Sequence, residues 1–222
     1  MSYPIKYPTP QGANIQIFNA SETKGTQTWT KPQGASFVWF TLIGAGGGGD
    51  GGSFGGSSGA VTNCMVPAFL IPDSLQIEVG QGATNGGSTL IIWQGSKASA
   101  GYTLLTANGG QGGGGVGGSA SPSNYFSAMG FYQSTQGDPD LGGGASATSF
   151  LSPGSQAVNN SGNYGYSQGN NGLGYFQMQP IIVGVGGSGI TTTQATTAIG
   201  CGGAQGSVPT IGGDGLVVII TW

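Results

Sequence analysis

Few residues of this chain could perform catalytic chemistry. Its 222 residues include no histidine and no arginine, and only 5% of them are charged. A Ser-His-Asp triad, a histidine-ligated zinc site and an arginine clamp on a phosphoryl group are therefore excluded. Asp138 and Asp140 flank a proline and form the closest pair of carboxylates in the sequence. Such a pair can hydrolyse glycosides or bind Ca²⁺ in a cleft, but Asp and Pro also favour solvated turns, and we interpret this pair and Asp214 as turn residues.

Two further motifs have plain structural interpretations. Gly44, Gly46 and Gly49 are spaced like the glycines of a dinucleotide-binding loop, but no helical pattern follows them, as that fold requires. Cys64 and Cys201 are far apart in the sequence. We interpret them as buried reduced thiols, and the sequence leaves open whether they pair. We therefore expect no enzyme activity, no cofactor and no metal site.

Composition also argues against nucleic acid and membrane partners. With four lysines and no arginine, the chain lacks the basic patch that neutralises phosphates. Its apolar runs are much shorter than the ~20 residues that a helix needs to cross a bilayer. The opening sequence MSYPIKYPTPQG has no apolar stretch after a basic start, so we expect no secretory signal.

The periodicity of apolar residues predicts an all-β fold. No stretch of helical length keeps apolar residues at helical spacing without an interrupting glycine or proline. Short runs rich in Val, Ile, Thr and aromatic residues, which are typical of strands, recur instead. The runs at 37–43 and 216–222 are almost wholly apolar, which predicts central strands covered on both faces. The predicted strands are 15–18, 26–30, 37–43, 60–66, 75–79, 89–93, 102–106, 181–185, 191–198 and 216–222.

Glycine accounts for 49 residues and forms dense blocks that continue directly from several of these runs. Polyproline II has three residues per turn, and only glycine fits where such helices pack closely. Glycine holds every third position over 46–55 and 109–118, and over 200–215 it holds five of six, with Pro209 at the other. Flexible linkers are the alternative. Because the blocks continue from strands, we favour packed polyglycine II helices.

The chain divides into an arm and a domain. We predict that residues 1–25 form an extended arm, because each of its prolines fixes φ and biases the residue before it away from helix. The arm is either a frayed terminus or a docking peptide that lies on a partner. Residues 26–222 are predicted to form a glycine-rich β domain. The candidate docking residues of the arm are Tyr3, Pro4, Tyr7 and Pro8.

Residues 117–179 are predicted to form a large loop insertion in this domain. The segment is rich in Ser, Asn, Gly and Tyr and has almost no branched aliphatic residues with which to build a core. Tyrosine supplies a large contact area at low entropy cost, and Ser and Asn supply adaptable hydrogen bonds, as in binding loops. The alternative is that the aromatic residues fill a small core of the segment itself. The candidate receptor-binding residues are Tyr125, Tyr132, Tyr164 and Tyr166.

Several motifs together carry a family resemblance. TWTKP at 28–32 is followed by Gly-Ala at 34–35, an apolar strand and GAGGGG at 44–49. IEVGQG at 77–82 joins a strand to glycine, and GGDG at 212–215 precedes the final strand. This order resembles the glycine-rich domain of phage tail fibres and related virion proteins, over most of residues 26–222.

The same order is similar to the glycine-rich extracellular domain of the anaplastic-lymphoma type receptor kinases. That resemblance implies a jelly-roll-like β-sandwich, related to tumour necrosis factor, from which polyglycine II helices project. The cysteines and the kinase portion of those receptors are absent, so the receptor role is not transferred. The expected fold is therefore all-β, a jelly-roll-like sandwich with packed polyglycine II helices and long Gly/Ser/Asn/Tyr-rich loops.

The resemblance implies a virion structural protein: a fibre, spike or decoration protein of a virus or phage, made in the host cytoplasm. We expect it to be a homotrimer that docks on other virion proteins through its arm and binds a host glycan or surface protein. The alternative is a self-assembling filament or matrix protein with no receptor. A polysaccharide depolymerase is the least favoured alternative.

Overall fold

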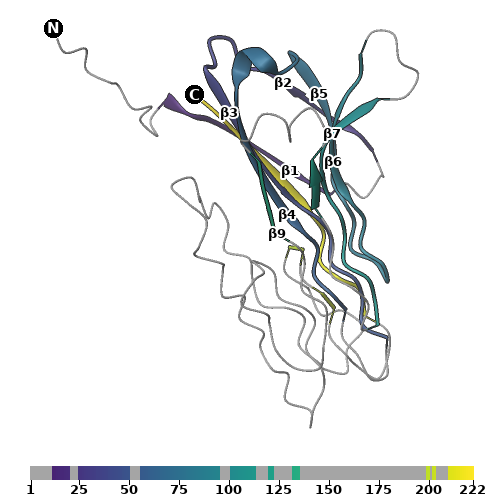
Figure 1. Ribbon diagram of the computed structural model, residues 1–222. Helices are drawn as coiled ribbons and strands as arrows, with labels where there is room; N and C mark the ends of the chain where they lie inside the picture. The colour runs from purple at the N-terminus through teal and green to yellow at the C-terminus, as the bar shows by residue number, and fades with distance from the viewer. Residues whose placement is uncertain are drawn as a thin grey trace, which may run out of the picture.

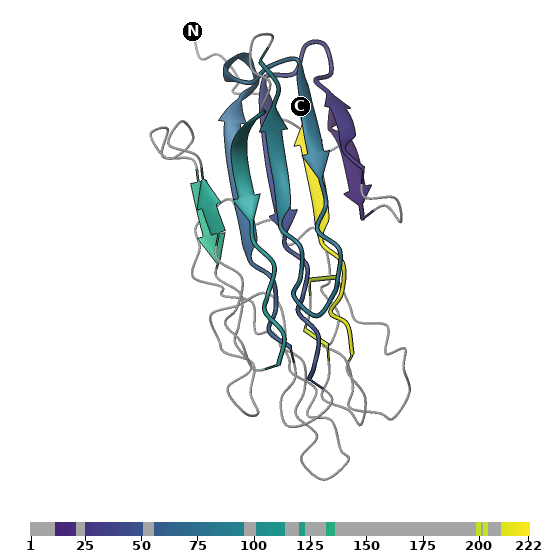
Figure 2. The same cartoon turned by 90° about the vertical axis from the view of Figure 1, so that its right-hand side faces the viewer.

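Two antiparallel β-sheets pack face to face in the computed structural model (Figures 1 and 2). The structure describes residues 12–20, 25–50, 56–95, 101–113, 120–122, 132–135, 199–200, 202–203 and 210–222. The helical content of these residues is the 3-10 turn η2 (Ala68–Leu70) and one further 3-10 residue, Gly12. The prediction of an all-β fold is therefore confirmed for the described part of the chain.

Within the described part of the chain, each sheet has five strands, and every neighbouring pair is antiparallel. The first sheet consists, in spatial order, of β1 (Asn14–Asn19), β10 (Leu216–Thr221), β3 (Phe37–Ile43), β4 (Val61–Pro67) and β9 (Tyr132–Thr135). The second sheet consists of β2 (Gln27–Thr30), β5 (Ser74–Glu78), β6 (Thr89–Trp93), β7 (Tyr102–Ala107) and β8 (Ala120–Pro122).

Most strands lie where the apolar pattern predicted them. Every predicted strand within the described residues forms, with its ends shifted by at most one residue. The predicted strands at 181–185 and 191–198 lie outside the described residues. The strands β8 and β9, which fall within residues 117–179, were not predicted, because Ala-Ser-Pro and Tyr-Gln-Ser-Thr lack an apolar pattern.

The central strands β3 and β10 are buried on both faces, as their continuous apolar sequences predict. In β3, Val38, Phe40 and Leu42 alternate into the main core between the two sheets. Trp39 and Ile43 belong to a second buried cluster, on the opposite face of the first sheet. A strand covered on both sides needs apolar residues at every position, which explains why FVWFTLI does not alternate.

Trp29 of the second sheet and two buried threonines, Thr62 of the first sheet and Thr89 of the second, tie the sheets together. Trp29 is fully buried and meets Phe40 edge to face, with ring centroids 6.0 Å apart. The hydroxyl of Thr62 donates to the carbonyl of Thr106 at 2.8 Å, and that of Thr89 donates to the carbonyl of Ile43 at 2.7 Å. A buried hydroxyl that satisfies a carbonyl of the facing sheet fixes how closely the sheets approach.

Cys64 lies within this core as a free thiol, and burial raises the pKa of the Cys64 thiol from 9.0 to about 12. This agrees with its interpretation as a buried reduced residue, whereas Cys201 lies outside the described residues. Among the described residues, the structure has no helix long and apolar enough to cross a membrane.

The raised pKa of Cys64 predicts a loss of stability in alkali. Above pH 9.0 the thiol ionises in the unfolded chain but keeps its proton in the folded protein up to about pH 12, so the unfolded state binds fewer protons over this window. The free energy of unfolding should therefore fall by about 2 kcal/mol from this group between pH 8 and pH 10.5. Urea titrations of wild type and Cys64→Ala measure the effect, and equal pH dependence in the two proteins would contradict it.

Candidate functional site: a glycine bundle and an aromatic groove

Most of the predicted binding residues lie outside the residues that the structure describes. Of the four tyrosines, only Tyr132 is described, at the start of β9, where its backbone pairs with Cys64 of β4. The others lie outside the described residues, as do the docking residues of the arm and the carboxylate pair: Tyr125, Tyr164, Tyr166, Tyr3, Pro4, Tyr7, Pro8, Asp138 and Asp140.

The first candidate surface is formed where the strands continue beyond both sheets at one end. β3, β5 and β7 lead out into segments 44–49, 80–84 and 108–113, and segments 56–60, 86–88 and 210–215 lead back into β4, β6 and β10. These segments, with residues 200 and 202–203, are called here the glycine bundle. They lie side by side at the lower end of Figures 1 and 2.

Segment 44–49 is hydrogen-bonded to three neighbours in turn. Successive N–H groups of the segment donate to residues 56–60, to 84–87 and to 210–213 in turn. N–H groups three residues apart therefore bond to the same neighbour. The bonds are Gly44 N to Ala60 O (2.9 Å), Ala45 N to Gly87 O (3.1 Å), Gly46 N to Gly213 O (2.8 Å), Gly47 N to Ser57 O (2.9 Å), Gly48 N to Thr84 O (3.0 Å) and Gly49 N to Thr210 Oγ1 (3.0 Å).

Other segments repeat the three-residue period. In 56–60 and in 210–215, N–H groups three residues apart again donate to one neighbour, so a segment is held from several directions. The N-to-O bonds are Gly56 to Gly203, Gly59 to Gly200, Ser57 to Gln111, Ala60 to Asn108, Gly212 to Ala83 and Gly215 to Gly80.

The close approach of these backbones requires glycine. A Cβ on Gly44 would overlap the carbonyl of Asn108, and a Cβ on Gly47 would overlap that of Gln111. The obstructing atoms are backbone, which cannot move aside as a flexible side chain can.

Asp214 is part of this bundle and is not the turn residue that the sequence suggested. Its Oδ1 accepts a hydrogen bond from Gly82 N at 2.7 Å, and its backbone carbonyl accepts one from Gly200 N at 2.7 Å. The carboxylate thus satisfies the amide of Gly82, which has no backbone acceptor among the described residues. Through its side chain and its carbonyl, Asp214 joins three segments. At the outer end of the bundle, the exposed residues Thr84, Asn85 and Gln111 are polar and uncharged.

The second candidate surface is an aromatic groove at the opposite end of the sandwich. It is a hollow of about 510 Å³ between residues 69–72 of the β4–β5 connection and the ends of β6 and β7. Trp93 and Tyr102 are a cross-strand pair, and Phe69 comes from the other wall. Phe69 is 83% exposed, Tyr102 50% and Trp93 42%, and none of the described residues that line the groove is charged.

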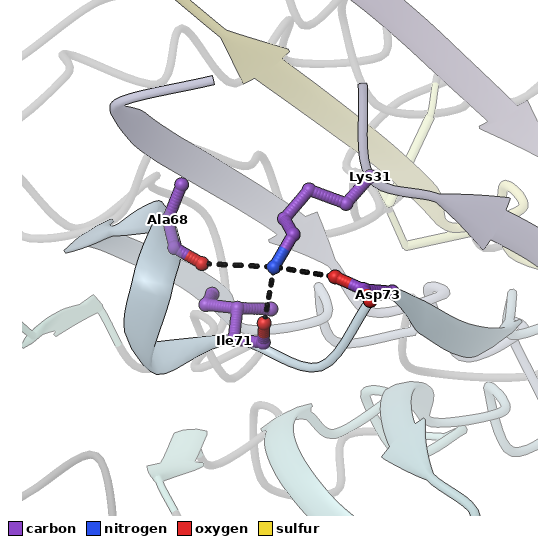
Figure 3. Close-up of polar contacts among 4 residues, drawn as sticks. All are labelled: Lys31, Ala68, Ile71 and Asp73. Atoms are coloured by element: carbon purple, nitrogen blue, oxygen red, sulfur yellow. Dashed lines mark hydrogen bonds and ion pairs between the residues drawn. The ribbon is translucent and has the colours of Figure 1, made fainter. Parts of the chain in front are cut away.

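A lysine clamp holds one wall of this groove (Figure 3). The Nζ of Lys31 donates to the carbonyls of Ala68 (3.2 Å) and Ile71 (2.8 Å) and forms an ion pair with Asp73 at 2.7 Å. The Lys31 side chain is only 19% exposed, whereas that of Asp73 is 90% exposed. The ammonium group therefore fixes η2 and the residues after it against the end of β2.

In the described residues, no three Asp, Glu, His or Cys side chains gather to hold a metal ion. Sequence reasoning did not identify the groove, because Phe69, Trp93 and Tyr102 are far apart in the chain. One signal was available: Phe-Leu-Ile-Pro at 69–72 is an apolar connection between strands, where polar turn residues are the rule.

The fold and these surfaces define a two-sheet β protein whose strands continue into a hydrogen-bonded bundle of glycine segments. The chain belongs to the glycine-rich domain family, whose model matches residues 21–220. The match covers the whole glycine bundle and both sheets except β1 and the last residue of β10. Among curated proteins, none matches the chain in sequence.

The clamp predicts an asymmetry between its two partners. Lys31→Met leaves two carbonyls without their charged donor and should lower the free energy of unfolding by about 1–3 kcal/mol. Asp73→Asn removes only an ion pair whose carboxylate faces water, and it should cost less than about 0.5 kcal/mol. Chemical denaturation measures both, and equal losses would show that the ion pair, not the carbonyl bonds, stabilises the loop.

The packing of the bundle predicts that glycine-to-alanine substitutions differ sharply in their cost to stability, according to what the added methyl group meets. Gly47→Ala should lower the free energy of unfolding by about 3 kcal/mol or more, because backbone has to shift to admit the methyl group. Gly95→Ala is the matched control, since its Cβ would meet only the ring of Trp93, at 3.8 Å. Thermal melting of both variants tests this, and a Gly47→Ala protein as stable as wild type would contradict it.

Proposed function

We propose that this chain is a virion structural protein, a fibre, spike or decoration protein of a virus or phage, which contacts the host surface. The observation that carries the proposal is the hydrogen-bonded glycine bundle, which extends the sandwich without a side-chain core and with hardly any charge. A segment held by backbone bonds from several sides offers few places for local opening, as a component exposed to proteases and solvent needs.

The detailed architecture belongs to the same proposal. We take the sandwich to be jelly-roll-like and the bundle to consist of polyglycine II helices. The alternation of hydrogen-bond partners every three residues supports this, since polyproline II has three residues per turn. A β-ladder would direct its N–H groups to two sides only.

The chain path gives the molecule two different ends. β1 begins at Asn14 opposite Thr221 of β10, at the end away from the bundle. Residues 1–13 therefore enter at that end, which suits an arm that docks on another virion protein. We propose Tyr3, Pro4, Tyr7 and Pro8 as its contacts.

The bundle end suits recognition. β9 finishes at Thr135, opposite Val61 at the bundle end of β4, and the described chain resumes at Ile199 beside the bundle. The segment that carries Tyr164 and Tyr166 thus leaves and returns at this end. Tyr125 lies between β8 and β9, which belong to different sheets. We therefore propose Tyr164 and Tyr166 as the main contacts for a host glycan or surface protein, with Tyr125 and Tyr132 contributing less.

A self-assembling filament or matrix protein is the second candidate, and the edge strand β1 favours it. β1 has a free edge within the described sheet, carries no Lys or Pro, and exposes Ile15 and Ile17 by 58% and 59%. Such edges pair readily with other chains. Analytical ultracentrifugation separates the candidates, because a closed trimer supports the virion protein and open polymers support the filament.

Substitution of the tyrosines tests the recognition role. The double variant Tyr164→Ala, Tyr166→Ala should lose host-cell adsorption with its melting temperature nearly unchanged, since both aromatic contact and hydroxyl bonds are removed. The matched variant Tyr164→Phe, Tyr166→Phe keeps the rings and should retain part of the adsorption. If the Ala variant unfolds, or adsorbs normally, these residues are structural and recognition lies elsewhere.

A further inference from the structure

The aromatic groove has the composition of a binding surface. Three of the large apolar side chains that the described residues expose, those of Phe69, Trp93 and Tyr102, line this one hollow. Clustered exposed aromatics mark contact sites far more often than scattered ones do. Because Lys31 fixes the wall that carries Phe69, the groove exists before anything binds, which lowers the entropy cost of binding.

The chemistry of the groove selects an extended, uncharged, proline-rich peptide. Its floor and walls are apolar, and its polar handles are the indole N–H of Trp93 and the hydroxyl of Tyr102. Proline-rich segments dock in aromatic-lined grooves of this kind, where proline rings pack on aromatic faces and such donors bind peptide carbonyls. A sugar would demand several more polar partners than this lining provides.

The chain itself carries such a peptide. Residues 1–11 contain Tyr3-Pro4, Tyr7-Pro8 and Pro10, with a single charge at Lys6. They join β1 at the same end of the sandwich as the groove. In polyproline II form, eleven residues span ~34 Å, enough to reach a neighbouring molecule. No glycine precedes Gly12, and three prolines restrict the backbone of the segment, so an extended form costs little entropy.

We propose that the groove of each copy binds residues 1–11 of a neighbouring copy, so that arms link the protomers. The inference deepens the docking role proposed for the arm by naming its partner as a second copy of this chain. It concerns the purified protein alone, so its test is independent of host adsorption.

Sedimentation velocity of the full-length protein over a range of concentrations tests the proposal. Trp93→Ala removes the groove's largest contact, and the triple variant Pro4→Ala, Pro8→Ala, Pro10→Ala removes the arm's stiffness and its proline rings. Each should weaken self-association at least about tenfold, the usual effect of losing an interface anchor. The two sets combined should weaken it no further than either alone, since both break one contact.

Two controls separate the groove from general effects. Ile211→Ala alters an exposed apolar residue of the bundle and should leave association unchanged. Melting temperatures near wild type show that Trp93→Ala is folded. An excess of a synthetic peptide of residues 1–11 should dissociate the wild-type assembly.

Three results would overturn the proposal. A wild-type protein that stays monomeric means that the arm binds its own groove or a different protein. Association that survives Trp93→Ala places the arm elsewhere on the neighbouring copy. If Trp93→Ala weakens association and the arm variant does not, the groove binds another part of the neighbouring copy, such as the exposed edge of β1.

Discussion

The structure depends on hydrogen bonds made directly between backbones that carry no side chains. In the glycine bundle, an amide of one segment reaches a carbonyl of the next at about the distance found within a sheet, but in several directions around the segment. Any Cβ at Gly44 or Gly47 would stand in the place of a neighbouring carbonyl. Glycine loses the most conformational entropy on folding, so the bundle is stable only when nearly all its amides find partners at once.

That requirement couples the bundle to the sandwich. The bundle segments have no core of their own, and their relative positions are set by the strands from which they continue. Thr89 shows the coupling at the junction: its hydroxyl donates to Ile43 O of the first sheet and accepts from Gly80 N, the first amide of a bundle segment. A shift of one strand by a residue would misplace every amide beyond it. The register in which β3 and β10 pair therefore also sets the register of the bundle segments that continue from them.

The sequence allowed the strands to be predicted because burial leaves a pattern that is local. FVWFTLI and LVVIITW need no partner to be recognised as strands covered on both faces. β8 and β9 form strands because they pair with β7 and β4, and their own residues carry no such pattern. The three-residue spacing of glycine was visible, but which frame meets a neighbour depends on how segments are placed in space. Gly44 and Gly47 face a neighbouring backbone at a distance that excludes a Cβ. They belong to a different three-residue frame from Gly46 and Gly49, which the sequence pattern singled out.

The candidate surfaces were harder to predict for the same reason. Phe69, Trp93 and Tyr102 meet only because two strand connections fall at one end of the sandwich, and Lys31 acquires its role only once η2 lies across the end of β2. The two ends of the molecule differ in chemistry: the aromatic groove lies away from the bundle, whereas the residues exposed at the bundle end are mostly polar, with Asp50, Asp214 and the apolar Ile211 among them. Apolar surface buried between copies is stabilising, whereas polar uncharged surface costs little to leave in water. We therefore propose that copies assemble at the end where residues 1–13 enter, with the glycine bundle as the end that projects.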